Sequence, residues 1–218
     1  MRIPGDTELI TFNGWTLRVR RALKQPARFV LLLHGWTGDE NSMWVFVRNF
    51  PEEYWVVAPR GPYVTQPNGY SWRELHAGLR NWPSLEDLRP SADSLIPLME
   101  DYAAHNQMDL HPFDVIGFSQ GAALTNAIAL LHPGRVRRLG VLSGFLPAGS
   151  ESLMEGQPLK GKPFFVAHGT LDEMIDIEYA RQSVALLERA GAQVTYCEDE
   201  IGHKLSANGL RALEVFFD

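Results

Sequence analysis

Short apolar segments alternate with longer segments of helical periodicity over most of this chain. The apolar segments are too short for stable helices and are typical of strands that are buried on both faces. We expect strands at residues 15–23, 29–33, 54–58, 114–118, 136–143, 163–167 and 193–198. We expect helices from Asn41 or Ser42 to about Phe50, around 95–103 with Pro97 in the first turn, and at 120–131, 177–190 and 206–217. This alternation predicts an α/β fold, a mainly parallel sheet with helices on both faces.

Composition excludes several classes of protein. The chain has 218 residues, a formal net charge of -6 and 45% hydrophobic residues, which predicts a single globular domain over residues 1–218 without a basic surface for nucleic acid. Its apolar runs reach five residues, as in Phe29–Leu33, whereas a membrane-spanning helix needs about 20. The first residues lack the apolar segment of a signal peptide, and Cys197 is the only cysteine. We therefore expect a cytoplasmic protein.

One connection is unusually long for an economical fold. Residues 60–90 contain several glycines and prolines together with aromatic residues, among them Trp72. Connections of this length are usually functional, so the segment is either a lid or binding loop, or an irregular loop whose aromatic rings pack on the core. We expect Trp72 to contact the substrate, and we place Phe145 there as well.

The segment Gly117-Phe118-Ser119-Gln120-Gly121 matches the pattern G-x-S-x-G. It follows an expected strand and opens an expected helix, which is the setting of a nucleophile elbow. In such a turn the serine adopts a strained backbone conformation and exposes its hydroxyl. The alternative is a serine that only caps the helix. Ser119 is therefore the candidate nucleophile.

A serine nucleophile needs a base and an acid that orients the base. His203 follows the last expected strand, at the carboxyl edge of the sheet, and is the candidate base. His34 and His168 also end strands, and we expect structural roles for them. The chain order serine, acid, histidine selects Asp172, with Glu173 and Asp176 as competitors. We expect Asp176 to cap the helix that begins at residue 177.

Acyl transfer also needs two donors for the oxyanion that develops on the substrate. Geometry assigns them to the backbone N–H groups of Gln120, after the nucleophile, and of Trp36, in the loop after an early strand. A stretch ending in Gly161-Lys162 resembles a phosphate-binding loop, but Pro163 follows it and it precedes a strand, so we reject that interpretation. The sequence contains no paired cysteines and no H-E-x-x-H pattern, and we expect no metal site.

Four blocks in order resemble the phospholipase/carboxylesterase family of α/β-hydrolases, which includes acyl-protein thioesterases. They are Leu33-His34-Gly35 with Gly38-Asp39-Glu40, then Gly117–Ala122, then His168-Gly169 with Asp172, then Gly202-His203. The resemblance covers residues 29–217. It implies an α/β-hydrolase fold without a separate cap domain and without a cofactor, with Ser119, Asp172 and His203 as triad and Trp36 and Gln120 at the oxyanion hole. The family commonly has a small residue where Trp36 and Thr37 stand, and valine and proline where Ile175 and Asp176 stand.

These inferences predict a serine carboxylesterase that hydrolyses small-molecule esters of apolar acyl or aryl groups through an acyl-enzyme. One alternative is a thioesterase or lysophospholipase acting on acyl-protein, acyl-CoA or lysolipid, because the same triad serves both. Another is a binding protein of the same fold that has no activity. Reaction with a fluorophosphonate probe separates the active hydrolases from the binding protein.

Overall fold

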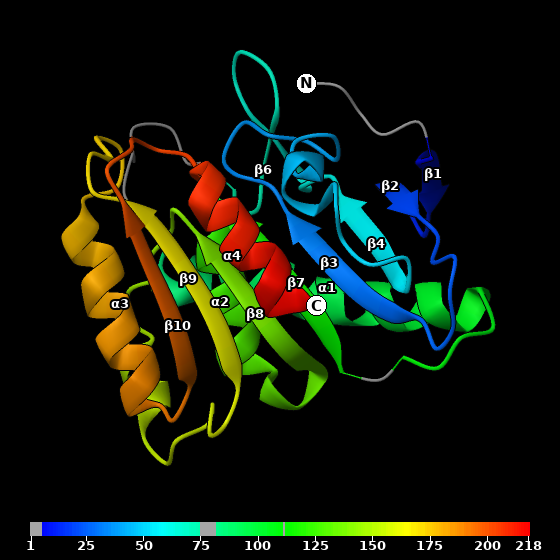
Figure 1. Cartoon of the computed structure of the whole chain (residues 1–218). Helices are drawn as coiled ribbons and strands as arrows, with labels where there is room; N and C mark the ends of the chain where they lie inside the picture. Colours follow the sequence, from blue (N-terminus) through cyan, green and yellow to red (C-terminus); the bar gives the residue numbers. More distant parts are fainter. Residues whose placement is uncertain (1–5, 75–81, 111) are drawn as a thin grey trace.

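The computed structural model describes residues 6–74, 82–110 and 112–218. An eight-stranded sheet in the order β1-β2-β4-β3-β7-β8-β9-β10 forms its centre (Figure 1). The strands are β1 (Glu8–Phe12), β2 (Trp15–Arg20), β3 (Arg28–Leu33), β4 (Tyr54–Pro59), β7 (Phe113–Phe118), β8 (Val136–Leu142), β9 (Pro163–Gly169) and β10 (Gln193–Asp199). All strands from β4 to β10 along this order run parallel, whereas β1 and β2 form an antiparallel hairpin that pairs with β4. The expected mainly parallel sheet is confirmed, and β1 is an additional edge strand.

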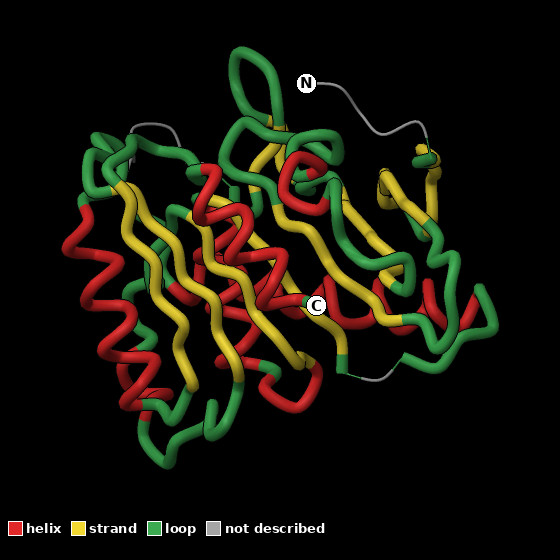
Figure 2. The backbone as a smooth tube through the Cα atoms, viewed as in Figure 1, coloured by secondary structure: helices red, strands yellow, loops and turns green. Residues whose placement is uncertain are grey.

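Helices cover both faces of the sheet, as expected. The helices are α1 (Leu85–His105), α2 (Gln120–Leu131), α3 (Ile177–Arg189) and α4 (Ala207–Phe217). In Figure 1, α4 crosses in front of the sheet and α1 and α2 lie behind it. The tube in Figure 2 shows the same layers, with the strands in yellow between red helices.

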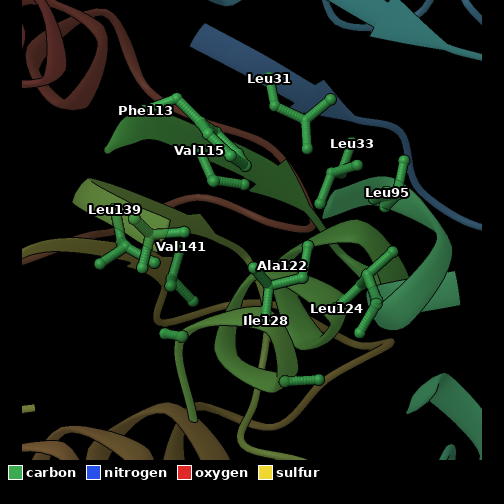
Figure 3. Close-up of a cluster of buried hydrophobic side chains, with 14 of the residues drawn as sticks. Leu31, Leu33, Leu95, Phe113, Val115, Ala122, Leu124, Ile128, Leu139 and Val141 are labelled. Atoms are coloured by element: carbon green, nitrogen blue, oxygen red, sulfur yellow. The ribbon is translucent and has the colours of Figure 1, made fainter. Parts of the chain in front are cut away.

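The pleat of the strands divides the buried side chains between two cores. Along β3, Leu31 and Leu33 belong to the core that also contains side chains of α1, α2 and α3, and the alternating residues Val30 and Leu32 belong to the core that contains side chains of α4. Figure 3 shows the first core, where Leu31 and Leu33 face side chains of α2. Because both faces are covered, every residue of β3 after Arg28 is buried, which explains the unbroken apolar run in the sequence.

Two expected helices differ from the structure. Helix α1 begins ten residues before Leu95, at a capping box formed by Ser84 and Asp87, and it holds both Pro90 and Pro97 in its interior. The expectation that Pro97 lies in the first turn is therefore wrong. Both prolines are on the exposed side of the helix, where water can reach the carbonyl groups that lose their helical partner.

The second difference is at residues 41–50, which form turns and the short 3-10 helix η1 (Trp44–Val47) instead of an α-helix. The Asp39 carboxylate accepts the Asn41 N–H, and the Trp44 indole donates to the Glu40 carbonyl, the group that an α-helix would need. Side chain to backbone bonds thus replace the first helical turn. The β-branched and aromatic residues that follow also favour helices weakly.

The long connection after β4 contains the hairpin of β5 (Tyr63–Val64) and β6 (Tyr70–Ser71). Of the expected loop 60–90, residues 75–81 lie outside the described residues, and residues from Leu85 onward belong to α1. No separate cap domain is evident in the part of the chain that the structure describes. None of the described helices is long and apolar enough to cross a membrane.

Candidate active site

Ser119 stands at a sharp turn between β7 and α2. Its backbone has φ 54° and ψ −116°, outside the regions that residues with a side chain prefer. Glycine is needed on both sides, because a Cβ atom at Gly117 would overlap the Gly121 carbonyl and one at Gly121 would overlap the Leu33 carbonyl. The N–H of Ser119 donates to Leu142 O at 2.9 Å, which fixes the turn to β8. The structure therefore has the strained strand–turn–helix geometry that the sequence predicts.

His203 and Asp172 meet at the same edge of the sheet, from loops after β10 and β9. Nδ1 of His203 lies 2.7 Å from Oδ2 of Asp172. The other carboxylate oxygen, Oδ1, accepts the N–H groups of Met174 at 2.9 Å and Ile175 at 3.0 Å. Burial by itself raises the pKa of Asp172, but the hydrogen bonds from Ile175, His203 and Met174 outweigh it and lower that pKa. The carboxylate is therefore ionised at neutral pH and can orient an imidazole.

A second histidine touches the same carboxylate. Nε2 of His168 lies 2.9 Å from Ile175 O and 3.3 Å from Oδ2 of Asp172. A carbonyl only accepts hydrogen bonds, so Nε2 of His168 carries a proton and points it at both oxygens. The bond to the Ile175 carbonyl agrees with the structural role expected for His168 at a strand end, whereas its contact with Asp172 was not expected. The four-residue spacing between His168 and Asp172 was the available signal.

The nucleophile and base candidates approach the same place from neighbouring loops. The ring of Phe118, next to Ser119, lies 5.0 Å from the ring of His203. Among the described residues, no hydrogen bond joins the Ser119 hydroxyl to His203. Such bonds are often long without substrate and shorten in the reacting complex, so this geometry is compatible with a catalytic pair.

The two candidate oxyanion donors flank Ser119. A Cβ atom built on Gly35 would lie 3.3 Å from Cβ of Ser119, which places the Gly35-Trp36 peptide directly against the serine. Within the described residues, the backbone N–H groups of Trp36 and Gln120 donate to no protein acceptor. Two unused N–H groups beside a strained serine are what an oxyanion requires.

A hollow with a volume of about 440 Å³ opens beside this group. Its walls come from the loop after β3, from η1, from the end of β7 and from the loop before α4. The lining residues are Gly35, Trp36, Thr37, Gly38, Ser42, Met43, Val45, Phe46, Phe118, Lys204 and Leu205. Lys204 is the single charged residue among them, so the hollow suits an apolar group of moderate size.

The family model described as phospholipase/carboxylesterase matches residues 16–218. The chain belongs to the phospholipase/carboxylesterase family. The resemblance seen in the four sequence blocks is thereby confirmed, and with it the α/β-hydrolase fold.

Relatives within this family carry names of three kinds. A probable carboxylesterase of Oryza sativa is 29% identical over 202 residues, covering 85% of this chain and 75% of the relative. A probable inactive carboxylesterase of the same species is 30% identical, covering 82% and 79%. Acyl-protein thioesterase 1 of Emericella nidulans is 26% identical, covering 90% and 92%. The solved structure of a Mesorhizobium loti carboxylesterase covers 97% of this chain and 98% of its own, with a TM-score of 0.79 at 23% identity, and supports the fold.

The structure corrects two of the expected substrate contacts. Trp72 has no exposed surface, and its indole donates to His34 O at 2.8 Å. Phe145 is 5% exposed and packs edge-on against Trp82, with ring centres 4.5 Å apart. Neither residue lines the hollow. Both rings belong to the packed interior, and the hydrogen bond and the aromatic contact that hold them there are not visible in the sequence.

The two carboxylates that compete with Asp172 lie in the same loop after β9. Asp176 is the N-cap of α3 and accepts the Glu178 N–H at 2.9 Å, as expected. Glu173 makes none of the contacts to His203 that Asp172 makes. Across the described ranges, no group of three or more His, Cys, Asp or Glu residues is arranged to hold a metal ion.

Proposed function

We propose that this protein is a serine carboxylesterase with Ser119 as nucleophile, His203 as general base and Asp172 as the acid that orients it. The observation that carries this proposal is the strained Ser119 turn beside a buried carboxylate–histidine pair joined at 2.7 Å. Backbone strain of this kind persists where function requires it, and the neighbouring residue Phe118 lines the hollow. Membership of the phospholipase/carboxylesterase family supports the same chemistry.

The reaction follows from the positions of these groups. The Ser119 hydroxyl attacks the ester carbonyl while the free nitrogen of His203, Nε2, takes its proton. The N–H groups of Trp36 and Gln120 bind the oxyanion of the tetrahedral intermediate. When the intermediate collapses, His203 gives its proton to the leaving alcohol and the acyl group stays on Ser119. Water then attacks the acyl-enzyme with the same assistance and releases the acid.

The substrate is an ester with an apolar acyl or aryl group, since apolar side chains and backbone dominate the hollow. A thioester substrate is the second candidate, favoured by the relatives named acyl-protein thioesterase 1, which align with most of this chain. The single lysine in the lining offers little charge for the phosphates of an acyl-CoA. We therefore rank neutral esters first. The lone Cys197 agrees with a reducing compartment, and we propose a cytoplasmic location.

The test has two parts. A fluorophosphonate probe should label wild-type protein at Ser119, located by peptide mass spectrometry, and should not label Ser119→Ala. Failure of folded wild-type protein to react would favour a binding protein without this activity; one relative is itself named a probable inactive carboxylesterase. A panel of p-nitrophenyl esters, S-acyl peptides and acyl-CoAs, compared by kcat/KM, then ranks ester against thioester.

A further inference from the structure

The segment Tyr70–Trp72, here called the strap, contacts both loops that carry the candidate oxyanion donors. It runs through β6 and lies between the loop after β3 and the start of α2. Resting on the proposed function, we propose that the strap fixes the two donors relative to each other, and that Trp72 and the side chain of Gln120 are positioning residues for the oxyanion hole. For Trp72, this positioning role takes the place of the direct substrate contact that we expected from the sequence.

The first side of the strap holds the loop that contains Trp36. Thr37 N–H donates to Tyr70 O at 3.0 Å, and Tyr70 N–H donates to Gly38 O at 3.0 Å, so the two segments pair like antiparallel strands. Gly69 allows this close approach, because a Cβ atom there would overlap the Thr37 backbone. Thr37 itself is held at φ 65°, a conformation that a β-branched residue rarely adopts. The pairing with the strap therefore keeps the loop in a shape that it does not favour alone.

The Trp72 side chain also contacts His34, the residue before Gly35 in the same loop. Its indole N–H donates to His34 O at 2.8 Å, and its ring packs against the imidazole with centres 4.8 Å apart. Gly61 N–H donates to Nε2 of His34, so the ring proton is on Nδ1, which donates to Gly35 O at 2.7 Å. Burial lowers the pKa of His34, which agrees with this neutral form.

These contacts determine where the Trp36 N–H points. The Gly35-Trp36 peptide is planar, and in a trans peptide the N–H points opposite to the C=O. The Gly35 carbonyl is held by His34 and also by Gly38 N–H at 3.0 Å. With the carbonyl fixed on that side, the Trp36 N–H faces away from His34. Because Gly35 lies close to Ser119, the serine is the neighbour of the Trp36 N–H.

The second side of the strap is attached to the other donor residue. Oε1 of Gln120 accepts the backbone N–H of Trp72 at 3.0 Å. The Ser71 hydroxyl lies close to both ends of the same amide, 3.3 Å from Oε1 and 3.1 Å from Nε2. The Ser91 hydroxyl of α1 holds the Trp72 carbonyl at 2.6 Å. Gln120, Ser71 and Trp72 are all buried, so water cannot replace a lost partner. One residue, Gln120, thus offers its N–H to the oxyanion and its side chain to the strap.

Donors that are fixed before the reaction stabilise the transition state more than the bound ester. Weakening the strap should therefore lower kcat and leave KM nearly unchanged. The His203–Asp172 pair has no contact with the strap among the described residues, so the pH dependence of kcat/KM should keep its midpoint. A purely structural defect would also lower the apparent kcat, because less enzyme is folded, but the folded enzyme would keep its affinity for an inhibitor that mimics the tetrahedral intermediate.

The experiment compares Trp72→Phe, which removes the indole N–H, with Trp55→Phe as a matched control. Trp55 is another buried indole, at the start of β4, stacked on Phe29 at 5.6 Å and outside the site. For Trp72→Phe we expect kcat on a p-nitrophenyl ester to fall about 10- to 100-fold, less than the loss of a whole oxyanion donor. KM should stay within about 2-fold, and the affinity of a trifluoromethyl ketone, which forms a tetrahedral adduct, should fall in step with kcat. Trp55→Phe should behave as wild type in all three measurements.

The outcomes separate this inference from the proposed function. If wild-type Ser119 does not react with the fluorophosphonate probe, the proposed function fails and the strap has no oxyanion hole to hold. If Ser119 reacts but Trp72→Phe keeps wild-type kcat and ketone affinity, the strap proposal alone is overturned. Should Trp72→Phe not fold, Ser71→Ala decides, because it removes the hydroxyl that contacts the Gln120 amide, a hydroxyl that also accepts the Arg73 N–H at 3.2 Å. The double variant Ser71→Ala with Gln120→Met should then lose little more kcat than Gln120→Met alone, and full additivity would contradict a shared strap.

Discussion

Oδ2 of Asp172 lies 2.7 Å from Nδ1 of His203, although 30 residues separate the two along the chain. The contact exists because β9 and β10 are parallel neighbours, so the loops that follow them leave the same edge of the sheet. The Asp172 side chain has no exposed surface, and its second carboxylate oxygen accepts two backbone N–H groups. Only Oδ2 therefore remains to accept the histidine proton, which fixes one tautomer of the ring.

Replacing Asp172 by Asn should separate it from its competitor Asp176. Asp172→Asn offers an N–H or a neutral oxygen where the imidazole needs a carboxylate, and kcat should fall by about 10⁴. Asp176→Asn should cost little, because Asn caps a helix as well as Asp and can still accept the Glu178 N–H. Steady-state kinetics on one p-nitrophenyl ester measures both. The opposite order of effects would identify Asp176 as the acid.

Removing the Ser119 hydroxyl should abolish turnover without unfolding the chain. Loss of a triad serine costs on the order of 10⁶ in kcat, and Ser119 makes no side-chain hydrogen bond to the start of α2. Ser119→Ala retains the positive φ, so its melting temperature should equal that of the wild type. Ser119→Gly should be equally inactive but more stable by about 1 kcal/mol, because glycine adopts φ 54° without strain. A tenth of wild-type kcat in either variant would exclude Ser119 as nucleophile.

The order of elements along the chain was predictable because each depends on local patterns. Both faces of β3 are buried, so its strand is an unbroken apolar run, and α2 is apolar on most sides for the same reason. The edge strand β1 was missed because its residues are exposed or half-buried and lack such a run. The helix expected from Asn41 was wrong because side-chain bonds of Asp39 and Trp44 compete with the helical backbone.

The candidate site was predictable to the extent that chain order and strand ends determine it. Ser119, Asp172 and His203 each follow a strand, and parallel strands bring their ends together. Trp72 was placed wrongly because an aromatic residue in a long loop has the same appearance whether its ring faces substrate or a buried carbonyl. Only the contact with His34 distinguishes the two cases. The second neighbour of the acid, His168, was likewise visible only as a spacing.

The rate should depend on a single proton loss. A histidine base must be neutral to accept the serine proton, so we expect kcat/KM for a neutral ester to rise with pH and then stay level. The lowered pKa of Asp172 keeps that carboxylate ionised at neutral pH. EDTA should not change the plateau, because no proposed step uses a metal. A rate that peaks in acid, or that collapses on chelation, would assign the chemistry to other groups.

Trp36 should limit the size of the acyl group. Its ring is 44% exposed and lines the hollow, whereas its proposed catalytic contribution comes from the backbone N–H, which substitution retains. Trp36→Ala should therefore raise kcat/KM for a long-chain p-nitrophenyl ester relative to kcat/KM for the acetyl ester. We expect this ratio to rise by roughly 10-fold, the usual effect of a small change in apolar contacts on specificity. Val45 lines the hollow on the side of η1 that faces away from the core. Val45→Trp is the matched change: it narrows the hollow and should reverse the preference. An unchanged preference in both variants would place the acyl group elsewhere.

His34 should make the fold less stable as the pH falls below neutral. Its imidazole has no exposed surface, and burial lowers its pKa against the opposing influence of Asp39 and Glu40. In the unfolded chain the ring titrates near ~6.5, so below that pH the unfolded state binds a proton that the folded state does not. The free energy of unfolding is then highest above pH ~6.5 and declines as the pH falls toward the lowered folded value. The decline is at most about 1.4 kcal/mol per pH unit for one proton.

Urea unfolding at pH 7.5, 6.0 and 5.0 measures this decline, with His34→Gln as the comparison. Glutamine has a donor and an acceptor but does not titrate, so its unfolding free energy should fall less between pH 6.5 and 5. The lowered pKa values of Asp39, Glu40 and Asp172 do not interfere, because these carboxylates lose their stabilisation only at more acidic pH, near and below their ordinary values of about 4. His34→Gln should also lower kcat, since the Gly35 carbonyl loses the ring that fixes it. Equal pH slopes in the two proteins would mean that folding does not lower the pKa of His34.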